Sequence, residues 1–225
     1  MKTSLPYWLI IGGLLVLPQV ILAQNEGNIW YFGDKAGLDF NSGIPQVNSS
    51  GQLDQLEGSS SISDLDGQLL FYSDGVRIWN RQHQLMPNGQ DLLGHFSSTT
   101  SALIVPKPCD PYLYYVFTST SLTIPPEDTS ISTGVYYSVV DMRLDEGRGD
   151  VVKEWKNIAL SNPAAEKILA VPHANQRDFW ILTRPVDSDE IHAFVLGPLG
   201  LKPEPVRSKS PYYIENCPSV CGTPG

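Results

Sequence analysis

The sequence predicts an all-β protein, a partial β-propeller of about three to four four-stranded antiparallel blades of the WD40-like type. Three observations favour this fold. A strand–turn–strand phrase occurs twice, first as Ala102–Pro106 with Tyr114–Thr118 and then as Ile168–Pro172 with Phe179–Thr183. Short apolar runs alternate with turn residues, and helix formers are not concentrated anywhere beyond the N-terminus. Repeats of about 40 to 45 residues with four strands each have the spacing of propeller blades.

The first 23 residues form a separate unit. Lys2 gives a positive start, the run from Tyr7 to Leu17 is almost entirely apolar, and Val20–Ala23 ends at a small residue. These features predict a secretory signal that is cleaved after Ala23. A membrane anchor is the alternative, but prolines and a glutamine interrupt the run, which is shorter than the roughly 18 apolar residues of a spanning helix. We expect a protein that is secreted or held at the cell surface, with no transmembrane span.

The charge of the chain limits its partners. The formal net charge is -9, and removal of Lys2 with the signal makes it -10. An acidic surface repels phosphate backbones, so we expect no nucleic acid partner. Phosphate loops and dinucleotide fingerprints are absent from the sequence, and we expect no cofactor.

The first predicted strands of the mature chain are Asn28–Phe32 and Gly37–Asn41, followed by a polar loop from Ser42 to Gly58. Residues 59 to 80 then contain three strands joined by tight turns, in which Asp-Gly pairs supply the turn geometry. These strands are Ser59–Ser63, Gln68–Tyr72 and Val76–Asn80. The region is predicted to be an antiparallel meander.

Two further units complete the predicted propeller region, which spans residues 24–210 and precedes an irregular Cys- and Pro-containing tail at 211–225. The second unit has strands at Ala102–Val105, Leu113–Thr118 and Val135–Val140, with an outer fourth strand at Asp150–Trp155. The third unit has strands at Ile168–Val171, Phe179–Thr183 and Glu190–Leu196, with Lys202–Val206 restricted to an edge by its two prolines.

The repeat also predicts how the units align and where the tryptophans lie. Matching Phe71–Ser73 with Val116–Thr118 gives an offset of 45 residues, and matching Val105 with Val171 gives 66. The extra length of the second offset falls mostly in a polar loop at residues 119–133. We expect four tryptophans to pack between blades rather than to form an exposed carbohydrate platform. These are Trp30, Trp79, Trp155 and Trp180.

Two sets of acidic residues are candidates for chemistry. Asp64, Asp66 and Asp74 form the most acidic local cluster, and they are weak calcium candidates because calcium prefers several oxygen ligands. The full calcium loop pattern is absent, and Asp-Gly pairs are also ordinary turn residues. A glycoside hydrolase would need two carboxylates facing each other across a cleft. Asp39, Asp74, Asp141 and Glu190 lie on or beside strands, but nothing in the sequence selects a pair, so no catalytic residue is assigned.

The cysteines leave several pairings open. Export permits a disulfide, and Cys217 could pair with Cys221 to close a small loop. Cys109 would then be free, or it could pair with either of the other two. No histidine lies near the Cys217/Cys221 pair in the sequence, so we expect no zinc site.

Three stretches of the sequence resemble the N-terminal region of a family of exported Bacteroidetes proteins. They are IWYFGDKAGLDFNSG, SISDLDGQLLFYSDGVRIWNRQHQLMPNG and SSTTSALIVPKP with the following YYVFT, and the resemblance covers roughly residues 28 to 207. Members carry a propeller-like region ahead of adhesion-type repeats and a type IX secretion sorting signal. The resemblance implies a surface protein associated with adhesion or gliding motility. The sequence departs from this pattern because it stops at Gly225 after about three and a half blades.

These observations lead to three functional hypotheses. The first is an exported binding or scaffold module without catalysis, which contacts protein or glycan at the cell surface. The second is a propeller glycan hydrolase, and the third is a truncated remnant of a larger surface protein. We also expect self-association through open blade edges, because an open edge exposes unpaired backbone groups.

Overall fold

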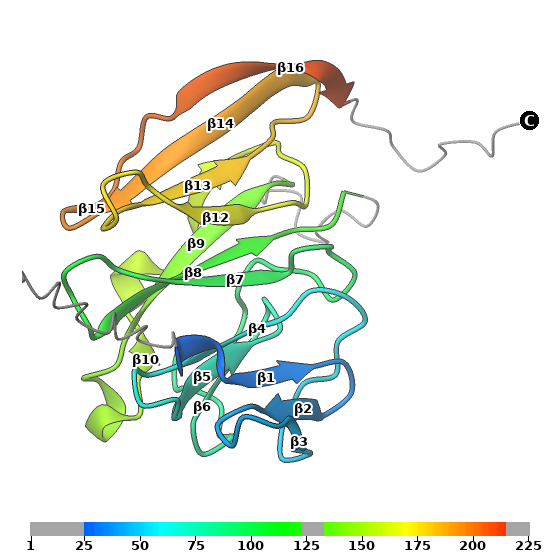
Figure 1. The fold of residues 1–225 in the computed structure, drawn as a ribbon. Helices are drawn as coiled ribbons and strands as arrows, with labels where there is room; N and C mark the ends of the chain where they lie inside the picture. Colours follow the sequence, from blue (N-terminus) through cyan, green and yellow to red (C-terminus); the bar gives the residue numbers. More distant parts are fainter. Residues whose placement is uncertain (1–24, 123–132, 215–225) are drawn as a thin grey trace, which may run out of the picture.

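The computed structural model describes residues 25–122 and 133–214, so the predicted signal and the Cys217/Cys221 pair lie outside it. The described residues form sixteen strands and three short 3-10 helices, η1 (Asn25–Gly27), η2 (Asp145–Gly147) and η3 (Lys153–Trp155) (Figure 1). All strand pairs within the sheets are antiparallel. The all-β class predicted from the sequence is confirmed.

The strands form four sheets, which we number in chain order. Sheet 1 contains β1 (Ile29–Phe32), β2 (Ala36–Asp39) and β3 (Gln46–Val47). Sheet 2 contains β4 (Ser60–Ser63), β5 (Leu69–Ser73) and β6 (Ile78–Asn80). Sheet 3 contains β7 (Ala102–Pro106), β8 (Leu113–Ser119), β9 (Val135–Asp141), β10 (Asp150–Val151) and β11 (Ile158–Ser161). Sheet 4 contains β12 (Leu169–Pro172), β13 (Phe179–Thr183), β14 (Ser188–Gly197), β15 (Gly200–Leu201) and β16 (Val206–Ile214).

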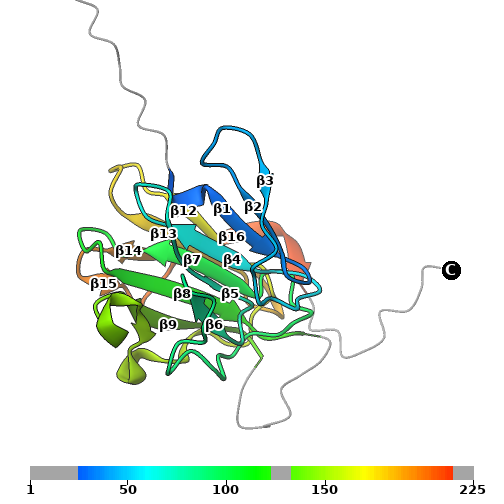
Figure 2. The same ribbon diagram turned by 90° about the horizontal axis from the view of Figure 1, so that it is seen from below.

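The first strands of consecutive sheets lie against one another, in the order β1, β4, β7 and β12. Figure 1 shows the resulting stack, with sheets 1 and 2 at the bottom, sheet 3 in the middle and sheet 4 at the top. Seen from below, β4 and β5 lie roughly along β7 and β8 (Figure 2). The stack brings together strands that are far apart in the sequence.

The two copies of the repeated phrase form equivalent hairpins, as the sequence predicts. In the β7–β8 hairpin Pro106 pairs with Tyr114, and in the β12–β13 hairpin Pro172 pairs with Phe179. Both hairpins keep their register over the whole pairing, and each is the first hairpin of its sheet. The internal repeat is therefore a structural repeat.

Sheet 1 differs from the other sheets in the direction in which it packs. The Ser59 hydroxyl donates to the Tyr31 carbonyl, and the Ser61 hydroxyl donates to the Ile29 carbonyl. Along β4 the residue number rises from 59 to 61, while the number of the β1 residue that it contacts falls from 31 to 29. Strands β1 and β4 therefore run in opposite directions. In contrast, β4 and β7 run in the same direction. The loop predicted between Ser42 and Gly58 contains the short strand β3 of this sheet.

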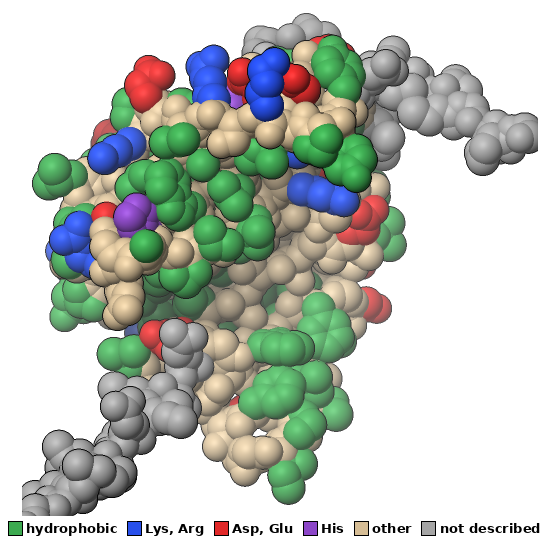
Figure 3. All heavy atoms as spheres, turned by 45° about the horizontal axis from the view of Figure 1, so that its top comes forward, with side chains coloured by type: hydrophobic (Ala, Val, Ile, Leu, Met, Phe, Trp, Pro, Cys, Tyr) green, Lys and Arg blue, Asp and Glu red, His purple; other side chains and the backbone are tan. Residues whose placement is uncertain are grey.

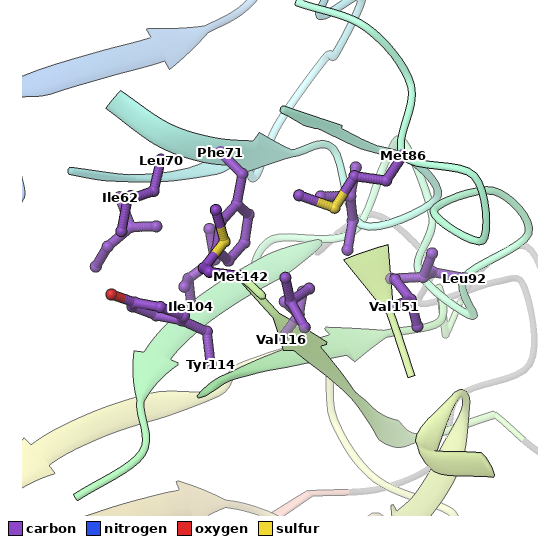
Figure 4. Close-up of a cluster of buried hydrophobic side chains, with 12 residues drawn as sticks. Ile62, Leu70, Phe71, Met86, Leu92, Ile104, Tyr114, Val116, Met142 and Val151 are labelled. Carbon is purple, nitrogen blue, oxygen red and sulfur yellow. The ribbon is translucent and has the colours of Figure 1, made fainter. Parts of the chain in front are cut away.

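Three hydrophobic cores hold the sheets together, one between each pair of neighbours. Strand β8 shows how one strand serves two cores, because successive side chains of a strand point to opposite faces. Tyr114 and Val116 point toward sheet 2, whereas Leu113, Tyr115 and Phe117 point toward sheet 4. Figure 4 shows the core between sheets 2 and 3. Burial on both faces explains the continuous apolarity of the β8 sequence.

The outer edge of sheet 3 corrects one prediction. Asp150–Trp155 is not a continuous fourth strand: β10 ends at Val151, and η3 begins at Lys153. The chain then returns as β11, and both β10 and β11 pair with β9. Strand β11 was not predicted, and in the structure Ser161 is the one buried residue of its four.

Sheet 4 has the same arrangement at its outer edge, where two successive strands pair with one neighbour: β15 and β16 both pair with β14. The prediction of an edge strand at Lys202–Val206 is wrong for most of its length, because β15 ends at Leu201 and β16 begins at Val206. The two prolines fall in the break, where no ladder hydrogen bond is required of them. Strand β16 continues to Ile214, four residues into the segment 211–225 that was expected to be irregular.

The offset of 45 between the second and third sheets is wrong by one residue. Phe71 lies in the core that follows its sheet, whereas Val116, its match at that offset, lies in the core that precedes its own sheet. Phe117 lies in the core that follows sheet 3. An offset of 46 therefore matches Phe71 with Phe117, and both side chains then point toward the next sheet along the chain. The pairing of β4 with β5 shifts at Leu70, where a β-bulge adds one residue. A shift of one residue reverses the face of every side chain in a strand.

The prediction that the tryptophans pack between sheets holds for one of the four. Trp79 is buried between sheets 1 and 2. Trp30 and Trp155 are each about half exposed, with values of 50% and 48%. Trp180 is half-buried, and it stacks on the His173 ring at a centroid distance of 5.0 Å. Trp30 and Trp180 lie on the first and last sheets, which have a neighbouring sheet on only one face.

Candidate binding pocket

A pocket of about 640 Å³ lies where the β4–β5 turn, the β7–β8 loop and η1 meet. It combines residues from three segments that are up to 88 positions apart, from Glu26 to Tyr114. Its lining residues are Glu26, Ile62, Asp64, Leu65, Asp66, Pro106, Lys107, Cys109, Asp110, Pro111 and Tyr114. The pocket exists because sheets 2 and 3 stack with these turns at the same end.

The buried part of the pocket is apolar and contains one phenol. Ile62 of β4 and Tyr114 of β8 are both buried, and both belong to the core between sheets 2 and 3. Burial raises the pKa of the Tyr114 phenol, and the charges of Asp64 and Glu26 raise it further. The phenol therefore stays protonated at neutral pH, and it donates a hydrogen bond of 3.3 Å to the Pro111 carbonyl.

One side of the rim is the turn between β4 and β5. The Asp64 carboxylate accepts hydrogen bonds from the backbone amides of Asp66 and Gln68, at 3.0 and 2.8 Å. Such a contact of an Asp side chain with its own turn is ordinary Asx-turn chemistry. Asp64 thus shapes the turn, and the turn places the exposed Asp66 carboxylate on the rim.

The other side of the rim is the β7–β8 loop. The Lys107 ammonium lies 3.7 Å from the Asp110 carboxylate, and the other oxygen of Asp110 accepts from the Tyr112 amide at 3.2 Å. Cys109 is exposed and has a left-handed backbone with φ of 62°, and it has no disulfide partner within residues 25–122 and 133–214. Its pairing with Cys217 or Cys221 stays a prediction, because both lie outside the described residues.

The pocket is negatively charged. Glu26, Asp64, Asp66 and Asp110 supply four carboxylates, and Lys107 supplies one ammonium. The difference is three negative charges around an apolar floor. Such a cleft concentrates positively charged ligands and repels anions.

The three calcium candidates do not come together. Asp64 and Asp66 precede β5 and Asp74 follows it, so they lie at opposite ends of that strand. The Asp74 side chain is only 2% exposed and pairs with Arg77 at 2.9 Å. Within residues 25–122 and 133–214 no group of three or more His, Cys, Asp or Glu side chains is placed to hold a metal ion.

The four carboxylates considered for hydrolysis are also dispersed. They lie in four different sheets, and each has a local contact: Asp39 with Asn41, Asp74 with Arg77, Asp141 with Arg143 and Glu190 with His192. The Arg143 guanidinium holds the pKa of the Asp141 carboxyl below its usual value. None of the four lines the acidic pocket.

Three of the pocket residues were predicted to matter for other reasons: Asp64 and Asp66 as turn residues or calcium ligands, and Cys109 as a cysteine of open pairing. Glu26, Lys107 and Asp110 were not predicted, and their only signal in the sequence is their place in polar segments beside predicted strands. No local pattern links the two turns, since only the stacking of sheets 2 and 3 brings them together.

Comparisons with protein-family models, with curated proteins and with solved structures find no match for this chain. Among the described residues, no helix has the length and apolarity needed to cross a membrane. The fold and the site therefore define an all-β protein of four antiparallel sheets with an acidic pocket at one end of the central sheets.

Proposed function

We propose that this protein is an exported, non-catalytic binding module that acts outside the cell or at its surface. Its four sheets correspond to blades of a partial propeller, and the acidic pocket binds the ligand. The single observation that carries the proposal is this pocket, which combines a buried aromatic floor with an excess of three carboxylates. The N-terminal signal features and the resemblance to exported Bacteroidetes surface proteins support the location.

The charge of the pocket favours a protein ligand over a glycan. Neutral sugars gain no charge–charge attraction from the carboxylates, and acidic sugars are repelled by them. A lysine or arginine side chain places its charge at the rim and its methylene stem against the apolar floor. The proposed ligand is therefore a basic segment of a surface protein.

The test is a binding titration of the secreted protein with fluorescent lysine- and arginine-containing peptides, alongside neutral and acidic oligosaccharides. We expect peptide binding that weakens as salt is raised, because the contact is partly electrostatic. The double variant Asp66→Asn/Asp110→Asn should weaken it at least about fivefold. Glu204→Gln removes an exposed carboxylate outside the pocket and serves as the matched control.

Equal binding by the pocket variant and the wild type would overturn the assignment of the pocket. Preferential binding of an oligosaccharide would overturn the ligand class. The same oligosaccharides are analysed for cleavage products, since turnover that survives purification would contradict a non-catalytic module. Nothing in the geometry favours the hydrolase hypothesis, because the four carboxylates named for it are dispersed over separate sheets.

A further inference from the structure

The outer face of sheet 4 is apolar and has no described neighbour. Side chains of β12, β13 and β14 that point inward belong to the core with sheet 3, so the alternate residues point outward. Leu169 and Val206 of this face are each 55% exposed. Its apolar residues are Leu169, Val171, Trp180, Leu182, Ile191, Ala193, Val195 and Val206.

The outer face of sheet 1 has the same character. Ile29 and Tyr31 point into the core with sheet 2, so Trp30 and Phe32 point away from it. Leu38 of β2 pairs with both Trp30 and Val47, which makes an apolar row across the three strands. Trp30 is 50% exposed and Val47 is 86% exposed. Figure 3 shows hydrophobic side chains gathered over sheet 4 and, separately, over sheet 1.

We propose that copies of this chain associate head to tail, with the outer face of sheet 4 of one copy on the outer face of sheet 1 of the next. The three internal cores already show that sheets of this chain stack through aromatic and aliphatic faces. Exposed apolar patches of several hundred Å² mark interaction sites. The apolar residues named above lie on faces of the terminal sheets, whereas the sequence predicts association through open blade edges.

Charge distinguishes between the possible pairings of these two faces. Residues 25–58, which contain sheet 1, carry five carboxylates and one lysine. Residues 164–214, which contain sheet 4, carry six basic and six acidic residues. Two copies of sheet 1 would therefore repel each other, whereas sheet 4 meets sheet 1 without that penalty.

Pairing through sheet 4 alone would leave the apolar face of sheet 1 uncovered in both copies. Strand spacings of about 4.8 Å and rises of about 3.3 Å per residue give a flat area of about 480 Å² for the strand residues of sheet 4 and about 160 Å² for those of sheet 1. A standard interface buries about 800 Å² per partner. One sheet face falls well short of that area. A closed head-to-tail pair makes two such contacts and covers apolar residues of both terminal sheets in each copy.

Residues 123–132 and 215–225 contain few apolar side chains that could cover sheet 4. Residues 215–225 contain only Val220 and the two cysteines as apolar residues besides prolines. Residues 123–132 contain two isoleucines and two prolines. A second copy supplies a complete aromatic face instead. Under the proposed function, in which the sheets are blades, two copies would bring eight blades together, within the range of about four to eight in propellers.

The test expresses the full chain with its own leader in an exporting host and measures its mass in solution by light scattering at micromolar concentration. Variant S1 is Trp30→Glu/Val47→Glu, and variant S4 is Leu169→Glu/Val206→Glu. We expect a wild-type dimer, or a longer series if the contact does not close into a ring. Each variant alone should be monomeric, with its dissociation constant raised at least about tenfold.

Mixing the two variants gives the decisive result. Head-to-tail association leaves sheet 4 of S1 and sheet 1 of S4 intact, so the mixture should form a 1:1 complex although neither variant associates alone. This complex should be weaker than the wild-type dimer, because it keeps one of the two contacts. Leu199→Glu alters a fully exposed leucine at the β14–β15 turn, outside both faces, and should leave the association unchanged. Near-ultraviolet circular dichroism confirms that each variant is folded. Should a double variant not fold, the single changes Val47→Glu and Val206→Glu repeat the mixing experiment.

Three outcomes would overturn the proposal. A monomeric wild type at all concentrations would mean that another segment or partner covers the two faces. A variant S1 that still dimerises would mean that sheet 4 pairs with itself. A mixture of S1 and S4 that stays monomeric would mean that the two faces do not contact each other.

Discussion

Replacement of Asp74 by alanine separates a structural role of this residue from the calcium site that the sequence suggested. One carboxylate oxygen of Asp74 accepts from the backbone amides of Val76 and Arg77, at 2.8 and 2.6 Å. The other accepts from the Arg77 guanidinium at 3.1 and 2.9 Å. The side chain is 2% exposed, so alanine leaves two backbone amides without their acceptor in a nearly dry turn.

The expected loss follows from these contacts. Hydrogen bonds to a charged group contribute about 1.5–3 kcal/mol each, and the ion pair adds little because Arg77 is substantially exposed. Part of the loss is recovered as water reaches the turn, so we expect the free energy of unfolding to fall by about 3 kcal/mol. For a chain of this size, that change lowers Tm by about 6–12 °C.

The measurement is urea unfolding followed by tryptophan fluorescence, with and without calcium. Asp74→Asn keeps an oxygen acceptor for the amides and should lose about half as much stability. Asp66→Ala removes an exposed carboxylate from the other turn and should change stability by less than about 0.5 kcal/mol. An Asp74→Ala protein as stable as the wild type, or a loss that appears only when calcium is present, would refute the reasoning.

Three further predictions concern the cores and their ionisable groups. Phe117→Ala should lower the free energy of unfolding by about 3–5 kcal/mol in denaturant titrations, and Phe117→Leu by much less, because Phe117 is fully buried between sheets 3 and 4. Gly75→Ala should reduce the yield of folded protein, since φ is +87° and the new Cβ would lie 2.2 Å from the Ser101 carbonyl oxygen. A yield equal to that of the wild type would contradict this. Burial raises the pKa of Tyr72 and Tyr114, so the unfolded chain loses these protons first, and stability should decline above about pH 10. Stability that is constant up to pH 11.5 would show that these phenols are not buried as described.

The strands were predictable because each is specified by its own residues. The runs around Leu113–Ser119 and Phe179–Thr183 are apolar and rich in aromatic and β-branched residues, and polar turns bound them on both sides. A hairpin joins neighbours in the sequence, so its pairing follows from the same local pattern. This is why the strands of the β7–β8 and β12–β13 hairpins match the predicted ones to within one residue at each end.

Predictions failed where the outcome depended on residues elsewhere in the chain. The bulge at Leu70 arises where β4 and β5 pair, and the sequence of neither strand predicts it. Strand β11 is held by β9, and its own residues are largely exposed. The exposure of Trp30 follows from the position of sheet 1 at the end of the stack, since the same side chain in an inner sheet would be buried.

The candidate pocket shows the same division. The sequence identified the Asp64–Gly67 turn and placed Cys109 in a turn after a strand. It did not indicate that these two turns face each other, and it suggested instead that Asp64, Asp66 and Asp74 form a cluster. Nearness in the sequence was misleading here because the five residues of β5 separate Asp74 from the other two.

The sequence by itself determined the all-β class, the order of the hairpins and the acidic character of the chain, because backbone preference, turn chemistry and charge are properties of a residue and its immediate neighbours. Only the tertiary structure decided which faces are buried, which turns form the pocket, and that the first and last sheets each expose an apolar face. Those features depend on the stacking of sheets far apart in the chain, which is set by the summed burial of side chains across three cores.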